Sequence, residues 1–216
     1  ACAPFRRLHL CHHNLETIKN TTSTTSDTLL AEVCMAAKYE GESLTRQHVK
    51  HKLTNHGFHT NICTVLARSF ADIGDIVRGR DLYFGKRKKK NKNGKETETE
   101  RDKLEENFKK YFQQIHDDVT KGGTKGGTNG QTLQARYKDD KENFFKLRED
   151  WWYANRGTVW KAITCEAPES DKYFRTTACA GTGTQGRCRC EGANADQVPT
   201  YFDYVPQYLR WFEEWA

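Results

Sequence analysis

The fold is decided by the stretch Arg148-Glu149-Asp150-Trp151-Trp152-Tyr153-Ala154-Asn155-Arg156-Gly157-Thr158-Val159-Trp160-Lys161-Ala162-Ile163-Thr164-Cys165, which contains three of the five tryptophans. On a helix this stretch and its lead-in form two adjacent rows of residues, at a spacing of about 3.6. The rows are Phe144, Leu147, Trp151, Ala154 and Thr158, and Phe145, Trp152, Val159 and Ile163. Large aromatic side chains bury much area and more often belong to a core than to a ligand site. We therefore predict that this helix anchors the core.

Further helices are predicted on both sides of this stretch. Residues 61–77 and 98–119 carry apolar residues at intervals of three and four. In the first of these, Gly74 costs about 1 kcal/mol relative to alanine unless it permits close packing. The last helix covers residues 204–215, with Pro206 in its first turn. Together with the tryptophan stretch, these helices predict a core that includes Phe70, Ile73, Trp151, Trp152, Trp160 and Trp211.

The N-terminal third has weaker patterns. Residues 1–11 suggest an irregular arm tied by cysteine. A helix is expected to begin at Ser26 or Asp27, either of which can serve as its N-cap, and Gly41 suits its C-terminal stop. A polar helix or hairpin arm follows over residues 43–56, and a helical run begins at 132–137 and leads into the tryptophan stretch. The whole chain is predicted to be all-α.

Composition limits the class of protein. The chain has 216 residues, 36% hydrophobic and 30% charged, which suits one large or two small domains with a very polar surface. No apolar run approaches the length of a membrane span, and no signal peptide is evident. Because the chain lacks an initiator methionine and stops within a helical pattern, we expect it to be a piece of a longer protein.

Eight cysteines spread along the chain predict disulfides and an extracellular setting. Zinc is the alternative, but the close pair Cys188 and Cys190 is separated by one residue, which is the wrong spacing for a zinc site. These two cysteines are also too close to pair comfortably with each other. Residues 166–200 are rich in glycine, threonine and alanine, so disulfides must hold this segment in place. The connectivity stays open.

The net charge of +6 includes a basic run at residues 86–95. Such a run can bind anions, and in an extracellular protein a sulfated glycan fits better than nucleic acid. The glycan-binding candidates are Lys86, Arg87, Lys88, Lys89, Lys90 and Lys92. The alternative is a solvated surface loop, since charge runs are usually solvated.

Other chemistry is not supported by the sequence. No set of nucleophile, base and orienting acid carries a local signature, so we expect no enzyme and no cofactor. Metal is not expected either, because no further ligand accompanies the histidines at 48, 51, 56 and 59. The Gly-Gly-Thr repeats at 121–130 lack the context of a phosphate loop. No nucleic-acid module is evident. A surface binding module remains.

Four motifs carry a resemblance to a known family: residues 2–11 (CAPFRRLHLC), 66–83 (LARSFADIGDIVRGRDLY), 148–156 (REDWWYANR) and 206–215 (PQYLRWFEEW). The chain resembles a Duffy-binding-like domain of the alpha class, from the Plasmodium falciparum erythrocyte membrane protein 1 family. The resemblance implies a partial, disulfide-stapled helical domain with long surface loops. Residues 1–60 would belong to the N-terminal subdomain, and 61–216 to the helical subdomain with inserted loops at 84–98, 121–131 and 166–200. A third subdomain would follow residue 216.

The resemblance also implies which cysteines pair. In related domains the first two cysteines bridge upstream, so Cys2 and Cys11 would lack partners in this chain. The internal set would then be Cys34, Cys63, Cys165, Cys179, Cys188 and Cys190.

The function implied by the resemblance is adhesion to host receptors from the surface of infected red cells. It includes rosetting and antigenic variation, and the chain would be part of a longer, membrane-anchored protein without touching the membrane itself. Family partners include heparan sulfate, complement receptor one, blood-group sugars and host antibodies. Specificity would lie in residues 86–95, 121–130 and 168–196. Binding either uses the basic run and a sulfated glycan, or uses another surface and a protein or neutral-sugar receptor.

Overall fold

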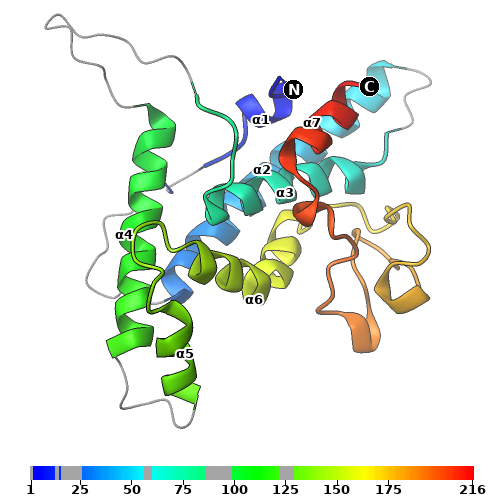
Figure 1. Cartoon of the computed structure of the whole chain (residues 1–216). Helices are drawn as coiled ribbons and strands as arrows, with labels where there is room; N and C mark the ends of the chain where they lie inside the picture. Colours follow the sequence, from blue (N-terminus) through cyan, green and yellow to red (C-terminus); the bar gives the residue numbers. More distant parts are fainter. Residues whose placement is uncertain (1, 13–14, 16–25, 56–59, 86–98, 122–128) are drawn as a thin grey trace, which may run out of the picture.

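The computed structural model describes residues 2–12, 15, 26–55, 60–85, 99–121 and 129–216. The described chain is all-α, as predicted, and forms no strand in these ranges. Figure 1 shows its elements, which are α1 (Phe5–Leu8), α2 (Ser26–Thr54), α3 (Ile62–Arg78), α4 (Glu100–Lys121), α5 (Asn129–Tyr137), α6 (Phe145–Ile163), η1 (Cys179–Gly181), η2 (Gly192–Asn194), η3 (Phe202–Tyr204) and α7 (Gln207–Trp215).

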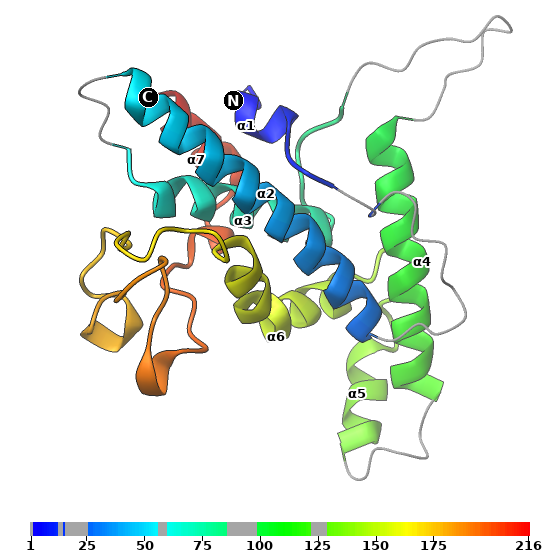
Figure 2. The same cartoon turned by 180° about the vertical axis from the view of Figure 1, so that it is seen from behind.

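Helix α6 holds the fold together. It packs against α2, α3 and α4, and in the view of Figure 2 the long helix α2 runs diagonally across the near side of the molecule. Trp152 and Trp160 of α6 both contact Phe70 of α3, with ring centroids 5.1 Å apart in each pair. Trp151 meets Phe112 of α4 at 6.0 Å. The six residues predicted for the core are all buried.

The predicted rows of α6 are partly wrong. Ala154, Thr158 and Phe145 are exposed, while Arg148 and Arg156 are buried. Both arginines are buried because each donates to at least one backbone carbonyl and to a carboxylate: Arg148 to Val77, Ile76 and Glu105, and Arg156 to Thr200 and Asp203. A pattern of apolar residues cannot reveal a charged side chain that is buried together with its partners.

Helix α3 matches the prediction closely. The side chain of Asn61 caps its first turn by accepting from the Cys63 amide (2.8 Å), and Gly79 ends it with φ of 72°. Gly74 does permit close packing, since a β-carbon there would lie 2.7 Å from the ring of Trp152.

The prediction for Gly41 as a helix stop is wrong. Helix α2 is 29 residues long, runs through Gly41 and includes residues 43–54 of the histidine-rich segment, which therefore form a helix and not a hairpin. Gly41 is buried where α2 meets the end of α6, so its missing side chain serves packing rather than termination.

The N-terminal arm also differs from expectation. It contains α1 and is held by ion pairs rather than by a disulfide: Arg6 contacts Asp72 (2.7 Å) and Glu214 (2.8 Å), and Arg7 pairs with Asp81. Burial raises the pKa of Asp72, but the charges of Arg6 and Arg210 outweigh burial and hold that pKa below its usual value. This network joins α1, α3 and α7.

The remaining predictions concern loops and subdomains. Helix α4 forms as predicted, but α5 begins at Asn129, inside the segment 121–131 that was expected to be a loop. Phe144, with φ of 53°, separates α5 from α6, so no continuous helical run joins them. The rest of that segment, like most of 84–98, lies outside the described residues. The division of the chain at residue 60 stays a prediction.

Candidate binding cleft

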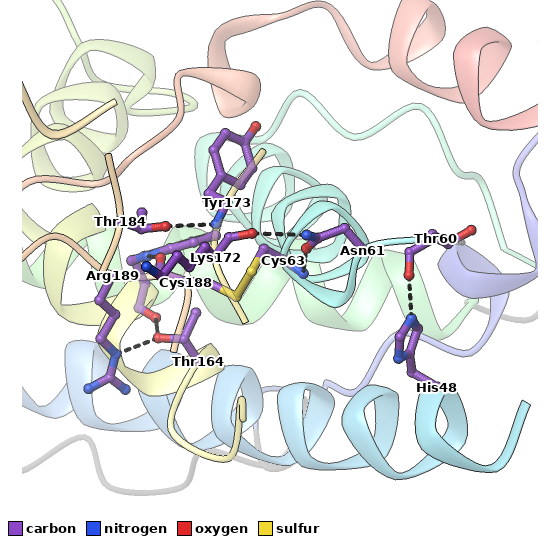
Figure 3. Close-up of a disulfide and its surroundings, with 11 residues drawn as sticks. His48, Thr60, Asn61, Cys63, Thr164, Lys172, Tyr173, Thr184, Cys188 and Arg189 are labelled. Carbon is purple, nitrogen blue, oxygen red and sulfur yellow. Dashed lines mark hydrogen bonds between the residues drawn. A yellow bond between two sulfur atoms is a disulfide. The ribbon is translucent and has the colours of Figure 1, made fainter. Parts of the chain in front are cut away.

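The segment between α6 and α7 is held in place by two disulfides. Cys63–Cys188 ties it to the first turn of α3, and Cys179–Cys190 closes it on itself. In Figure 3 the first bridge lies between α3 and the segment, and Arg189 next to it donates to Thr164 Oγ1 (2.7 Å). The expectation that disulfides hold residues 166–200 in place is therefore confirmed, and Ala167, Tyr173 and Val198 of this segment are also buried in the core.

The expected disulfides of Cys34 and Cys165 do not form. Both side chains remain as thiols, because no other cysteine of the described chain is bonded to them. Burial raises the pKa of the Cys34 thiol to about 11, and Cys165 interacts with Arg189 instead. Cys2 and Cys11 take part in neither of the two bridges.

Hydrogen bonds fix the same segment against α3. Asn61 Nδ2 donates to the carbonyl oxygen of Lys172 (2.9 Å), and the amide of Tyr173 donates to Thr184 Oγ1 (2.7 Å), as Figure 3 shows. The hydroxyl of Tyr173 donates to Thr200 Oγ1 (3.0 Å). Two separate parts of the segment are thus joined through one buried tyrosine.

A cleft of about 730 Å³ opens between this segment, α3 and α7. Thr64 and Ala67 of α3 form one wall, the other walls come from residues 173–180 and 197–205, and Glu213 of α7 stands at the edge. The volume is in the range of ligand pockets. The segment therefore builds a concave surface on a helical frame.

Aromatic side chains line the cleft and remain open to solvent. Phe174 is 58% exposed and Tyr201 is 72% exposed. The ring of Tyr201 lies 5.2 Å from the guanidinium of buried Arg156. Arg156 in turn binds Asp203 (2.6 Å) and the carbonyl oxygen of Thr200 (2.7 Å). Exposed rings on a fixed backbone are a common feature of interaction surfaces.

A second cleft of about 390 Å³ lies beside the first, between α6 and residues 196–201. Gln197, Val198 and Tyr201 line both clefts, so they form the ridge between them. The second cleft is edged by an exposed ion pair between Lys161 and Asp196 (2.5 Å).

The backbone of the larger cleft is strained at one place. Cys179 and Ala180, which line it, both have φ of 56°, a conformation that L-residues rarely adopt. The Cys179–Cys190 bridge and the bond from Asn194 Nδ2 to the Cys179 carbonyl (3.2 Å) hold this geometry. Strain maintained by surrounding structure is often found at functional sites.

Residues 1–210 match the family described as the Duffy binding domain. The chain belongs to the Duffy binding domain family. It is similar to the NTS-DBL1(alpha-1) domain of Plasmodium falciparum membrane protein 1 (PfEMP1) from the varO strain, with 42% identity, TM-score 0.74, and coverage of 100% of this chain and 43% of that chain. The identification from sequence as an alpha-class domain of this family is confirmed.

The family resemblance extends to other solved domains. The DBLbeta domain of PfEMP1 IT4var13, solved bound to ICAM-1, is 31% identical with TM-score 0.67, and the match covers 100% of this chain and 44% of that chain. This chain thus spans less than half the length of each of these solved relatives.

No curated protein matches it. Across the described ranges, no helix is both long enough and apolar enough to cross a lipid bilayer.

The predicted glycan-binding residues, Lys86 to Lys92, lie outside the described residues, as does most of 121–130. Of the segments expected to carry specificity, 168–196 does line the cleft, through residues 173–180. Within the described ranges, no group of three or more His, Cys, Asp or Glu residues could hold a metal ion.

Sequence reasoning missed Phe174 and Tyr201 as surface groups. The available signal was two aromatic pairs, Tyr173-Phe174 and Tyr201-Phe202, in a part of the chain without helical periodicity.

Proposed function

We propose that this chain is an adhesion module that binds a host protein receptor through the cleft between α3, α7 and the disulfide-held segment. In this proposal it acts as a binding module rather than an enzyme. It is displayed on the infected red cell as part of a longer, membrane-anchored variant antigen. Membership of the family supports this, because a solved DBLbeta relative is bound to ICAM-1.

The observation that carries the proposal is the exposed aromatic lining of a cleft built on a rigid frame. Function is often carried by loops that a scaffold positions, and aromatic anchors dominate protein interfaces. The segment that builds the cleft includes residues 168–196, one of the three segments in which the family resemblance places specificity. A protein receptor fits this lining better than a sulfated glycan, which needs several cations close together.

A sulfated glycan, heparan sulfate among them, is the second candidate. It is favoured by the charge density of Lys86, Arg87, Lys88, Lys89, Lys90 and Lys92. Binding of this kind weakens steeply as salt increases. Binding of complement receptor or of blood-group sugars would use a surface other than the basic run and goes with the first candidate, whereas rosetting is compatible with both candidates.

The test is adhesion of uninfected red cells and endothelial cells to cells that display the full chain, with and without soluble heparin. The double variant Phe174→Ala/Tyr201→Ala should abolish adhesion, and heparin should have little effect. The matched control is Phe212→Ala, because Phe212 is 69% exposed on α7 and does not line the cleft.

The opposite result has an equally clear meaning. The second candidate would replace the first if three results are found together. Heparin abolishes adhesion, a variant with Lys88, Lys89 and Lys90 changed to Gln does not adhere, and Phe174→Ala/Tyr201→Ala still adheres.

A further inference from the structure

We infer that the larger cleft binds a protein segment that presents an apolar side chain next to a carboxylate, and that Arg175 is the partner of that carboxylate. This inference rests on the proposed function and names the chemistry of the receptor segment.

The apolar part of the site is the floor and one side of the cleft. It is formed by Ala67, Val198, Pro199 and Phe202, of which the first three are buried, with the ring of Phe174 open to solvent beside them. Apolar side chains that enter such a concave surface lose their contact with water, which is the main favourable contribution to association.

The charges at the edge of the cleft differ in how they are paired. Glu213 is already bound, because Arg68 Nη2 donates to both of its carboxylate oxygens at 2.8 and 2.7 Å. Arg175 is exposed and lies against the ring of Phe174, with its guanidinium carbon 5.5 Å from the ring centroid. No carboxylate of the described chain forms an ion pair with Arg175. The cleft therefore offers one cation for an incoming carboxylate.

Both parts are held before any ligand arrives. Tyr173, next to Phe174, is fixed by Thr184 and Thr200. On the other side of Arg175, the chain is closed by the Cys179–Cys190 bridge. A site that is already ordered loses less conformational entropy on binding. A guanidinium stacked on a ring also remains free to bind a carboxylate through two N–H groups.

The experiment is a titration of the isotope-labelled full chain with capped dipeptides, followed by the NMR signals of Thr177 and Ala178 in the cleft wall. The probes are acetyl-Asp-Phe-amide, acetyl-Phe-Asp-amide, and the analogues with Asn in place of Asp or Ala in place of Phe. The better Asp/Phe peptide should bind about fivefold more tightly than its Asn analogue, as expected for an exposed charge pair. The Ala analogue should bind more weakly still.

Arg175→Gln should remove the preference for Asp over Asn and leave the preference for Phe over Ala. Arg187→Gln is the matched control: Arg187 is an exposed arginine of the same segment, pairs with Glu169, and does not line the cleft. It should keep both preferences.

Several outcomes would overturn the inference. These are an Asp preference that survives Arg175→Gln, peptide-induced shifts confined to other surfaces, or no saturable binding of any peptide. Adhesion lost in Arg175→Gln but not in Arg187→Gln would support it in the cellular assay. If the chain does not adhere to cells but binds the peptides in a way that depends on Arg175, the proposed function is refuted and this inference is not. If adhesion is lost in Phe174→Ala/Tyr201→Ala but Arg175→Gln does not change peptide binding, this inference is refuted and the proposed function is not.

Discussion

Gly41 of α2 lies against the carbonyl oxygen of Ile163 at the end of α6, so closely that a β-carbon at residue 41 would be 1.9 Å from that oxygen. Gly41→Ala should therefore destabilise the chain by about 3 kcal/mol, although alanine favours a helix over glycine by about 1 kcal/mol. Urea unfolding measured by circular dichroism gives the free energy. Glu42→Ala, at the exposed neighbouring position, should stay within about 0.5 kcal/mol of the parent.

Gly74 gives an internal comparison for this prediction. Its nearest neighbour is the Trp152 side chain, which can shift, whereas the neighbour of Gly41 is backbone. Gly74→Ala should cost less than Gly41→Ala, about 1–2 kcal/mol. If Gly41→Ala destabilises the chain no more than Gly74→Ala does, or stabilises it, the close approach to the Ile163 carbonyl costs less than predicted.

Gly41 also illustrates what the sequence could and could not predict. The helices with regular apolar spacing were predicted well, because the spacing that buries one face of a helix is visible locally. The role of Gly41 depends on a residue more than a hundred positions away, so the local sequence predicts a helix stop at Gly41 and not the close packing that the structure shows. Arg148 and Arg156 were missed for the same reason, since only the fold brings them to their partners.

Arg148 is the second place where a single change should be costly. It is fully buried and donates to the carbonyls of Val77 (2.5 Å) and Ile76 (3.1 Å) at the end of α3, and to both oxygens of Glu105 in α4. Arg148→Met removes the side-chain donor from the Val77 carbonyl and the Glu105 carboxylate, while the Ile76 carbonyl keeps the Gly79 amide (3.1 Å). This substitution should destabilise the chain by about 3 kcal/mol in the same unfolding assay.

Arg80→Met is the control for Arg148. Arg80 is also an arginine near the end of α3, but its side chain is 57% exposed and pairs with Glu149 at the surface. Its loss should cost at most about 1 kcal/mol. If Arg148→Met and Arg80→Met lower the free energy of unfolding by similar amounts, the structural role given to Arg148 is contradicted.

Tyr137 predicts a specific dependence on alkaline pH. Burial, together with the bond that its hydroxyl donates to Asp150 (2.7 Å), raises its pKa from 10.0 to about 12. A group with a raised pKa in the folded state contributes stability that is complete below pH 10 and is lost as the pH rises through about 12. Stability should therefore fall less steeply in Tyr137→Phe than in the parent over this range. Tyr153→Phe, at a 70% exposed position, should follow the parent.

The candidate site was predicted from sequence only in part. The family resemblance places specificity in residues 168–196, among other exposed loops on the helical frame, and residues 173–180 of this segment do line the cleft. The other walls, Thr64 and Ala67 of α3 and residues 197–205, carry no signal that joins them to that segment. The bridge between Cys63 and Cys188 makes this connection, and its pairing was open at the level of sequence.

Cys34 should be slow to react with alkylating reagents. Burial raises its pKa from 9.0 to about 11, and the thiolate is the reactive form. At pH 8 the thiolate fraction should therefore be about 100-fold lower than that of the same thiol in denaturant. Iodoacetamide labelling followed by peptide mass spectrometry measures both rates. A labelling rate that is unchanged by denaturant would contradict the buried thiol, and no labelling in denaturant would mean that Cys34 is in a disulfide.

The two disulfides should contribute unequally to stability and to binding. Cys63–Cys188 spans 125 residues and Cys179–Cys190 spans 11. From the entropy of the unfolded chain, their contributions to the free energy of unfolding are about 5 and about 3 kcal/mol, so Cys63→Ala/Cys188→Ala should be the less stable variant by about 2 kcal/mol.

The variant Cys179→Ala/Cys190→Ala should keep the helical core, because this bridge lies within the segment between α6 and α7. Without this bridge, Cys179 and Ala180 are free to leave their strained conformation and the cleft wall loses its shape. Adhesion should therefore be lost in this variant although its helices stay folded. Unfolding and cell adhesion measured on both variants test this, and unchanged adhesion in Cys179→Ala/Cys190→Ala would remove the cleft wall from the binding surface.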